Sequence, residues 1–313
     1  MKVAGIAARL AAAAGTGVAA GLVAVSGPAV AAAAPGCVPW TTERVAEGYG
    51  TLENLAFDGR GGMLLSESSL TGSDGAIRRL EANGSRTTAV PEVKAPGAIV
   101  VEGDTAYFTT GNGFVSGLLG RSDGTIDALD LDTGAVTTVE TALTMPNGLA
   151  QLPDGDFVVS RDIGQSTGLT RVPGSAELPS GFAPSLSSTN GVAYDETTRR
   201  LYVATTFNPV TTVAAVDIDH PDASPRRFDL PGVGPINSAD DLTVGPDGSV
   251  YVALNVAGTV VRLDPATGAQ CTIAAGLPLV SSVRFGSGPG WDPNALYATS
   301  FLGTVVKLTP PAP

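Results

Sequence analysis

Six stretches of this 313-residue chain repeat one pattern: an apolar strand, a turn carrying Gly, Asp or Asn, and a second apolar strand. They are LENLAFDGRGGMLLSES, PGAIVVEGDTAYFTTG, PNGLAQLPDGDFVVSRD, TNGVAYDETTRRLYVATT, ADDLTVGPDGSVYVALN and VSSVRFGSGPGWDPNALYATSF. We call the second residue of each stretch its register position; these are Glu53, Gly97, Asn147, Asn190, Asp240 and Ser281. Successive register positions are 44, 50, 43, 50 and 41 residues apart. Repeats of this length, each with about four short strands, are typical of a β-propeller.

The repeats predict an all-β fold over residues 35–313, a six-bladed β-propeller with four-stranded blades around a central channel. Most repeats are followed by a third strand, such as GTIDALDLDTG or GTVVRLDPATG. The composition agrees, because 40 Gly and 23 Pro with short apolar runs favour strands over helices. The segment before Glu53, VPWTTERVAEGYG, is expected to pair with the last blade and close the ring.

The N-terminus predicts a secretory signal peptide over residues 1–34 and therefore a secreted, extracellular protein. Lys2 and Arg9 form a short basic region, an apolar stretch of small residues follows, and GPAVAAAAP offers cleavage positions. A membrane anchor is the weaker alternative, because Gly, Ser and Pro interrupt the stretch. A lipoprotein anchored through Cys37 is disfavoured, because APGC lacks the usual Leu. No later segment is apolar enough to span a bilayer.

The two cysteines, Cys37 and Cys271, lie near the start and the end of the predicted mature chain. In an exported protein two cysteines most simply form one disulfide. Such a bridge would tie the N-terminal strand to the final blade. The alternative, a nucleophilic cysteine, lacks a basic partner nearby in the sequence.

The formal net charge of −12 argues against a nucleic-acid partner, because the chain offers no basic face for phosphates. An acidic surface tolerates cations. We expect a monomer that binds a small molecule.

The register positions predict a metal site. The first strand of each propeller blade lines the channel, so the residues at its start converge at one mouth. Four of them carry oxygen ligands of the kind that Ca²⁺ or another hard divalent cation prefers: Glu53, Asn147, Asn190 and Asp240. A cation would also offset the repulsion between the adjacent Asp240 and Asp241. The alternative is that these are turn residues that bond only to the backbone.

The loops between the second and third strands of each blade return to the same mouth. They predict walls for a substrate pocket, with four candidate binding residues: Asn112, Asp162, Phe207 and Asn208. Apolar residues in two of these loops suggest a partly apolar ligand: Phe114, Val115, Leu118, Leu119 and Phe207. The long second-blade loop, which contains GNGFVSG, is either a lid or simply flexible.

The phrases MPNGLAQLPDGDFVVS, TNGVAYDETTRRLYVATT and ADDLTVGPDGSVYVA resemble the senescence-marker protein/gluconolactonase/luciferin-regenerating enzyme-like family. This family is related to paraoxonase-type lactonases and, more distantly, to strictosidine-synthase-like propellers. The resemblance implies a divalent metal, usually Ca²⁺, and hydrolysis of lactones or esters. It also implies that Glu53, Asn147 and Asn190 are metal ligands, and that Asp240 is both ligand and base.

The chain departs from the paraoxonase-type pattern in three ways. Gly97 stands where those enzymes carry a catalytic His, and the only His of this chain, His220, lies in a Pro-rich turn expected at the surface. Asn54 and Gly148 stand where a second, buried calcium would need acidic residues. Asp241 occupies a position that is Asn in paraoxonase-type members and Gly in gluconolactonase-type members. A His-assisted mechanism is therefore not expected.

The sequence thus favours a secreted hydrolase in which the metal polarises a lactone or ester carbonyl and Asp240 or Asp241 activates water. One alternative is a non-catalytic propeller that binds a ligand or protein and keeps a structural calcium. A condensing enzyme of the strictosidine-synthase type is a third interpretation, for which nothing in the sequence calls.

Overall fold

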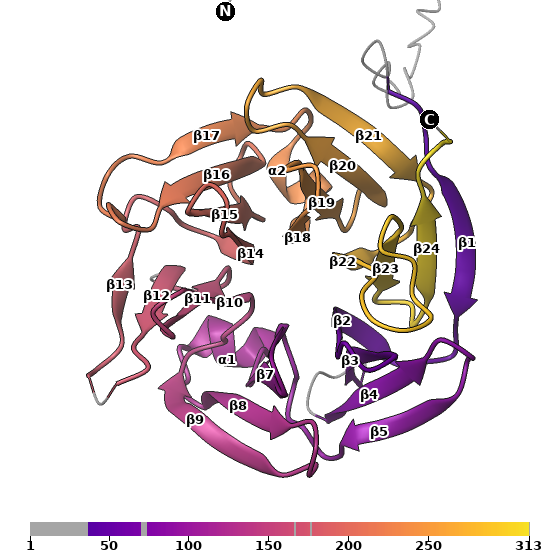
Figure 1. Cartoon of the computed structure of the whole chain (residues 1–313). Helices are drawn as coiled ribbons and strands as arrows, with labels where there is room; N and C mark the ends of the chain where they lie inside the picture. Colours follow the sequence, from indigo (N-terminus) through magenta and orange to yellow (C-terminus); the bar gives the residue numbers. More distant parts are fainter. Residues whose placement is uncertain (1–36, 70–73, 166, 176, 313) are drawn as a thin grey trace, which may run out of the picture. The chain divides into compact units, whose positions relative to one another are not determined.

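The computed structural model describes residues 37–69, 74–165, 167–175 and 177–312. It contains six four-stranded antiparallel sheets arranged as blades around a central opening (Figure 1). The predicted six-bladed, four-stranded propeller is confirmed. The predicted signal peptide over residues 1–34 lies outside the described residues.

Each blade is named here by its order along the chain, and its strands are given from the channel outward. Blade one contains β2 (Thr51–Phe57), β3 (Gly62–Ser68), β4 (Gly75–Glu81) and β5 (Arg86–Val90). Blade two contains β6 (Ile99–Glu102), β7 (Thr105–Thr110), β8 (Gly124–Asp130) and β9 (Val136–Leu143). Blade three contains β10 (Leu149–Gln151), β11 (Phe157–Arg161), β12 (Gly168–Val172) and β13 (Ser180–Phe182).

The second half of the ring repeats this arrangement. Blade four contains β14 (Thr189–Asp195), β15 (Arg200–Thr205), β16 (Thr212–Asp217) and β17 (Arg226–Asp229). Blade five contains β18 (Ala239–Val244), β19 (Val250–Leu254), β20 (Thr259–Leu263) and β21 (Gln270–Ala275). Blade six contains β22 (Val280–Phe285), β23 (Leu296–Ser300), β24 (Val305–Thr309) and β1 (Thr41–Ala46).

The ring closes through the N-terminal strand, as predicted. Strand β1 pairs antiparallel with β24, from Thr41 opposite Thr309 to Ala46 opposite Val305. Figure 1 shows β1, in indigo, as the outermost strand beside β24, in yellow. The sixth blade is therefore built from both ends of the described chain.

The core lies between neighbouring sheets. Apolar side chains of adjacent blades pack into six buried clusters, for example Tyr202, Val213 and Phe228 of blade four against Leu242 and Val252 of blade five. The second strands of most blades are buried on both faces and show nearly unbroken apolar runs, as in VYVAL of β19. Burial of this apolar surface is the main stabilising term of the fold.

A set of buried hydroxyl groups joins the blades around the channel. Each hydroxyl donates to a backbone carbonyl at the start of the next blade's inner strand: Ser66 to Gly97, Thr109 to Asn147, Ser160 to Asn190, Thr206 to Ala239 and Ser281 to Leu52. These bonds fix the backbone at or next to the register positions. The side chains at the mouth therefore stand on a rigid frame.

The predicted disulfide between Cys37 and Cys271 is present, with a Cα–Cα distance of 5.7 Å. The prediction that the bridge ties the N-terminal strand to the final blade was wrong, because Cys271 lies on β21, the outer strand of blade five. The chain before β1 crosses to that strand, where the Trp40 N–H donates to the Ile273 carbonyl oxygen at 2.7 Å. The bridge therefore ties the closing segment to the fifth blade.

The described residues form two short helices, α1 (Phe114–Leu119) and α2 (Gly234–Asn237), both in loops. Neither has the length and apolar character that crossing a membrane would require.

Candidate functional site

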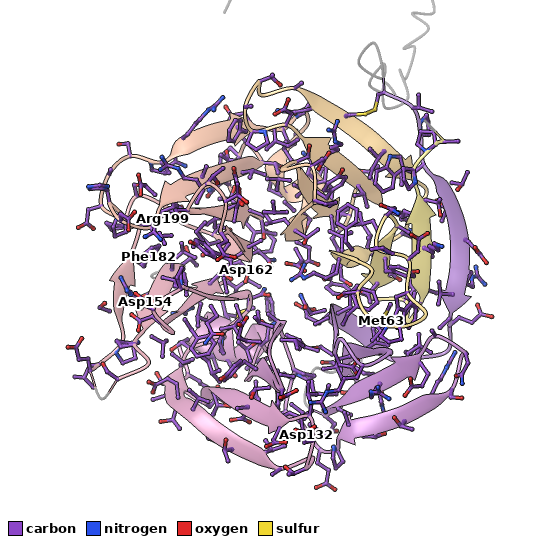
Figure 2. The ribbon with its side chains drawn as sticks, in the orientation of Figure 1. Met63, Asp132, Asp154, Asp162, Phe182 and Arg199 are labelled. Atoms are coloured by element: carbon purple, nitrogen blue, oxygen red, sulfur yellow. A yellow bond between two sulfur atoms is a disulfide. The ribbon has the colours of Figure 1, made fainter. Side chains whose placement is uncertain are left out.

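Four carboxylate side chains gather where the inner strands begin. Glu53 lies on β2, Asp240 and Asp241 lie on β18, and Asp162 directly follows β11. Figure 2 shows Asp162 toward the central opening, whereas Asp132 and Asp154 lie at the outside of the ring. Asp162, Asp240 and Asp241 are buried, so their charges are largely removed from water. No described Lys, Arg or His forms an ion pair with Glu53, Asp162 or Asp240.

Glu53 receives one hydrogen bond, from Asn112 Nδ2 to Oε1 at 2.9 Å. Burial, followed by the negative charge of Asp162, raises the pKa of Glu53 to about 7. Asp240 receives a hydrogen bond from Asn255 Nδ2 at 3.0 Å. Burial, with the charges of Glu53 and Asp241, raises the pKa of Asp240 well above its ordinary value. Without a positive charge these groups resist ionisation.

Asp162 lies beside the two predicted asparagine ligands. Asn190 Nδ2 donates to Asp162 Oδ2 at 3.4 Å and to Thr206 Oγ1 at 3.1 Å. Burial raises the pKa of Asp162 to about 6, and the neighbouring Asn147 amide offsets part of that effect. An amide that spends its N–H groups in this way keeps its carbonyl oxygen for another partner. The predicted substrate residue Asp162 thus lies among the predicted metal ligands.

Two buried oxygens at the mouth have no hydrogen-bond partner among the described residues: Asp162 Oδ1 and Asn112 Oδ1. Unpartnered buried oxygens are costly, and a cation that they face removes the cost. The donor set of carboxylate and amide oxygens suits a hard divalent ion. No three His, Cys, Asp or Glu side chains within the described ranges lie close enough to bind a metal on their own. A cation here would therefore depend on the asparagine oxygens as well as on Glu53 and Asp240.

Asp241 points into a different network from Asp240. Its Oδ2 accepts hydrogen bonds from Ser282, from Asn54 Nδ2 at 2.9 Å and from Arg284 Nη1 at 2.6 Å. Asn54 Oδ1 in turn accepts the backbone N–H of Ile99 at 3.2 Å. The network connects the inner strands β2, β6, β18 and β22 across the channel. The charge of Asp241 is thus balanced inside the protein, unlike that of Asp240.

Sequence reasoning missed Arg284, although a signal existed. Arg284 is the only Lys, Arg or His in the six inner strands. A lone basic residue in a strand that lines the channel indicates a buried acidic partner, because an unpaired buried charge costs several kcal/mol. Asn54, which stands where a second calcium would need an acid, serves the same network as a hydrogen-bond donor.

The remaining register positions, Gly97 and Ser281, add no free oxygen to the mouth. A Cβ on Gly97 would lie 2.4 Å from Thr109 Oγ1 and 3.1 Å from the Asn147 carbonyl oxygen, so no side chain fits there. Ser281 is fully buried and hydrogen-bonds Leu52 and Thr299. The only histidine, His220, has a side chain that is 76% exposed, as predicted for a surface turn.

The described residues of the loops predicted as walls differ in what they contact. Asn112 hydrogen-bonds Glu53. Asn208 instead hydrogen-bonds Ser187, with no hydrogen bond to a described carboxylate. Phe207 is about half exposed on the fourth-blade loop. From the sequence, the second-blade loop was either a lid or simply flexible. In the structure it contains helix α1. Arg161 Nη2 holds it by donating to the Gly117 carbonyl oxygen at 2.9 Å.

Several solved structures share this fold. A gluconolactonase from Xanthomonas campestris is 18% identical, with a TM-score of 0.61, over 90% of this chain and 99% of that chain. A luciferin-regenerating enzyme is 15% identical, with a TM-score of 0.62, over 87% of this chain and 95% of that one. Virginiamycin B lyase from Staphylococcus aureus is 10% identical, with a TM-score of 0.57, over 87% and 99%. Their different names show that the likeness establishes the fold alone.

No curated protein matches the chain in sequence. The family model described as the SMP-30/gluconolactonase/LRE-like region matches residues 73–301. That span runs from blade one to the end of β23 in blade six. It includes Asn112, Asn147, Asn190 and Asp240, although Glu53 lies before it. The chain therefore belongs to the SMP-30/gluconolactonase/LRE-like family.

Proposed function

We propose that this protein is a secreted, divalent-metal-dependent hydrolase of lactones or esters, with Ca²⁺ as the first candidate metal. The observation that carries the proposal is the set of buried carboxylates that no described Lys, Arg or His pairs with, beside two buried oxygens that find no hydrogen bond in the described part of the chain. Membership of a family that includes gluconolactonases supports the lactonase class.

Four side chains would hold the metal: Glu53, Asn147, Asn190 and Asp240. A bound divalent cation supplies Lewis acidity, which polarises a carbonyl and stabilises the oxyanion. The hydrogen bonds from Asn112 to Glu53 and from Asn255 to Asp240 keep the two carboxylates oriented. Asp162 and Thr206 orient the amide of Asn190.

Asp240 is the proposed base that accepts the proton of the attacking water. From the sequence, Asp241 was the better-placed second base if it is not itself a metal ligand. Because three donors already occupy Asp241 Oδ2, we assign it to holding the β18 backbone beneath Asp240. The proton would thus move to the carboxylate that pairs with no described Lys, Arg or His.

The mouth combines polar and apolar walls, which favours a substrate with a reactive carbonyl and an apolar part. Asn112 and Asp162 offer polar contacts beside Glu53, whereas Phe207 and helix α1 offer apolar ones. Aliphatic lactones and aryl esters meet this description better than bare sugar lactones.

The test is hydrolysis of a panel of aliphatic lactones, sugar lactones and aryl esters by the mature protein, with Ca²⁺ and then with excess chelator. We expect turnover that chelator abolishes. Asp240→Asn should remove it, whereas Asp264→Asn, a surface control in the turn after β20, should not. Calorimetric titration of the metal alone would measure binding separately.

A non-catalytic binding propeller remains the second candidate, because Gly97 leaves no space for a side chain where paraoxonase-type enzymes carry their His. Tight Ca²⁺ binding without turnover of any substrate in the panel would favour it. Absence of both metal binding and turnover would overturn the proposed hydrolase.

A further inference from the structure

Large apolar side chains that remain in solvent are concentrated on one face of the propeller. Of fourteen such described side chains, ten lie in loops at the channel mouth. We call these ten the apolar rim: Phe114, Val115, Leu118, Leu119, Phe207, Val210, Val233, Ile236, Val256 and Leu302. Exposed apolar side chains gathered on one face mark a candidate interaction surface, whereas apolar residues scattered singly over a surface are ordinary.

The topology explains why these residues share a face. The inner strand of each blade begins at the mouth and runs away from it, and the next strand returns antiparallel. Loops between second and third strands, and loops between blades, therefore all lie at the mouth end. The rim residues occupy such loops in blades two, four, five and six and between blades four and five.

Helix α1 presents the largest part of the rim. Its Ser116 and Gly117 are buried, and a Cβ on Gly117 would lie 2.2 Å from Met145 Sδ. Arg161 holds the same turn through the Gly117 carbonyl oxygen. With that side packed, Phe114 and Leu118 remain 63% and 58% exposed. The apolar side chains thus face solvent because the other side of the helix is already anchored.

Charge is distributed in the opposite way. Six mouth-side loops contain no Asp, Glu, Lys, Arg or His: residues 183–188, 206–211, 231–238, 255–258, 276–279 and 301–304. Turns at the far end carry acidic residues in nearly every blade, for example Asp104, Asp132, Asp154, Asp219 and Asp264. The loops on the mouth side of blades four and five, and the β23–β24 loop of blade six, are therefore uncharged above the buried Asp240 and Asp241, whereas the loop that carries α1 also contains Arg121 and Asp123. The turns at the other end are acidic.

We propose that the apolar rim docks the protein onto a neutral lipid surface, of the kind formed by zwitterionic phospholipids, with the channel mouth toward the lipid. Loop tips that expose Phe, Leu, Ile and Val side chains, and that carry no charged residue in blades four and five, suit insertion at the boundary between headgroups and acyl chains. The net charge of −12 opposes an anionic surface, and the acidic far end turns toward water. This docking goes beyond the proposed hydrolysis and does not depend on it.

The test is co-sedimentation of the mature protein with vesicles of pure phosphatidylcholine, in low and high salt. We expect partition that salt does not weaken. Leu118→Glu and Ile236→Glu should each lower the partition coefficient about tenfold, because each removes the burial of one large apolar side chain. Val139→Glu is the matched control: Val139 is 44% exposed on β9, away from the rim, and should bind as the unaltered protein does. Unfolding midpoints of all variants would separate docking from folding defects.

Three results would overturn the proposal. The first is no partition into phosphatidylcholine vesicles, including the case in which the protein binds only vesicles that contain anionic lipid. The second is a loss of partition in Val139→Glu equal to that in the rim variants. The third is a concentration-dependent dimer in analytical ultracentrifugation that Ile236→Glu dissociates, which would assign the rim to a second copy of the chain. None of these measurements uses hydrolysis, so failure of the docking and failure of the proposed function are distinguishable.

Discussion

Replacing Arg284 by Met should destabilise the protein strongly, because it leaves the Asp241 charge buried in the channel. The side chains of Arg284 and Asp241 are 18% and 6% exposed, and Nη1 lies 2.6 Å from Oδ2. Removing one partner of a buried ion pair costs about 3–5 kcal/mol. Ser282 and Asn54 still donate to Asp241 in the variant, so we expect about 3 kcal/mol. That is a large part of the roughly 5–15 kcal/mol that stabilises a folded domain.

The assay is urea unfolding in the presence of chelator, for Arg284→Met, Asp241→Asn and the double variant. Removing both charges leaves no buried ion, so the double variant should be more stable than Arg284→Met by about 2 kcal/mol. Arg262→Met is the control, because its ion pair with Asp247 is 40% exposed on both sides. Exposed pairs contribute about 0–1 kcal/mol.

The reasoning would be refuted if Arg284→Met cost no more than Arg262→Met. It would also be refuted if the effects of the two single variants simply added in the double variant. Either result would mean that water reaches Asp241 and that the network does not connect the inner strands.

Three further outcomes are expected. Cys37→Ser should lower the free energy of unfolding by up to about 5 kcal/mol under oxidising conditions, because the bridge closes a loop with a sequence separation of 234 residues; urea unfolding with and without reductant measures this. The metal-free protein should gain stability as pH falls from about 7 to about 5. Burial raises the pKa of Glu53 to about 7 and of Asp162 to about 6, so the folded state binds more protons than the unfolded state in this window. Thermal unfolding in chelator should show a rising midpoint, and a falling one would contradict the burial of these acids. Gly97→Ala should destabilise by about 1–3 kcal/mol, because its Cβ would meet Thr109 Oγ1; an unchanged denaturant midpoint would show that the backbone can yield there.

The fold was predictable because the propeller repeats one local unit. The apolar strands and the Asp-Gly turns specify each blade, and the register positions follow from the repeat. The pairing of β1 with β24 was also inferred, since an incomplete last blade leaves one strand position to fill. The blade that contains Cys271 was not predicted correctly. Adjacent outer strands belong to different repeats, and no local pattern encodes how the chain crosses between them.

The candidate site was predictable in its positions and not in its partners. The repeat placed Glu53 and Asp240 at the mouth, but contacts across the channel join strands that are far apart in sequence. The bond from Arg284 to Asp241 spans 43 residues, and the bond from Asn54 to Asp241 spans 187. Asn54 and Asp241 each come directly after a register position, so the repeat gives their level in the channel but not which side chains meet there. Side-chain direction decides which of the two adjacent aspartates receives the arginine.

The closing strand has a consequence for the order in which the chain folds. Strand β1 emerges first during synthesis, but its partner β24 comes last, so β1 remains an unpaired edge while nearly the whole chain is made. Cys271 emerges before β24. In an oxidising environment the bridge to Cys37 can form once blade five is present and can hold β1 beside the position that β24 will fill. The covalent link then acts as a guide for the last step of ring closure, and its loss would slow that step as well as weaken the finished ring.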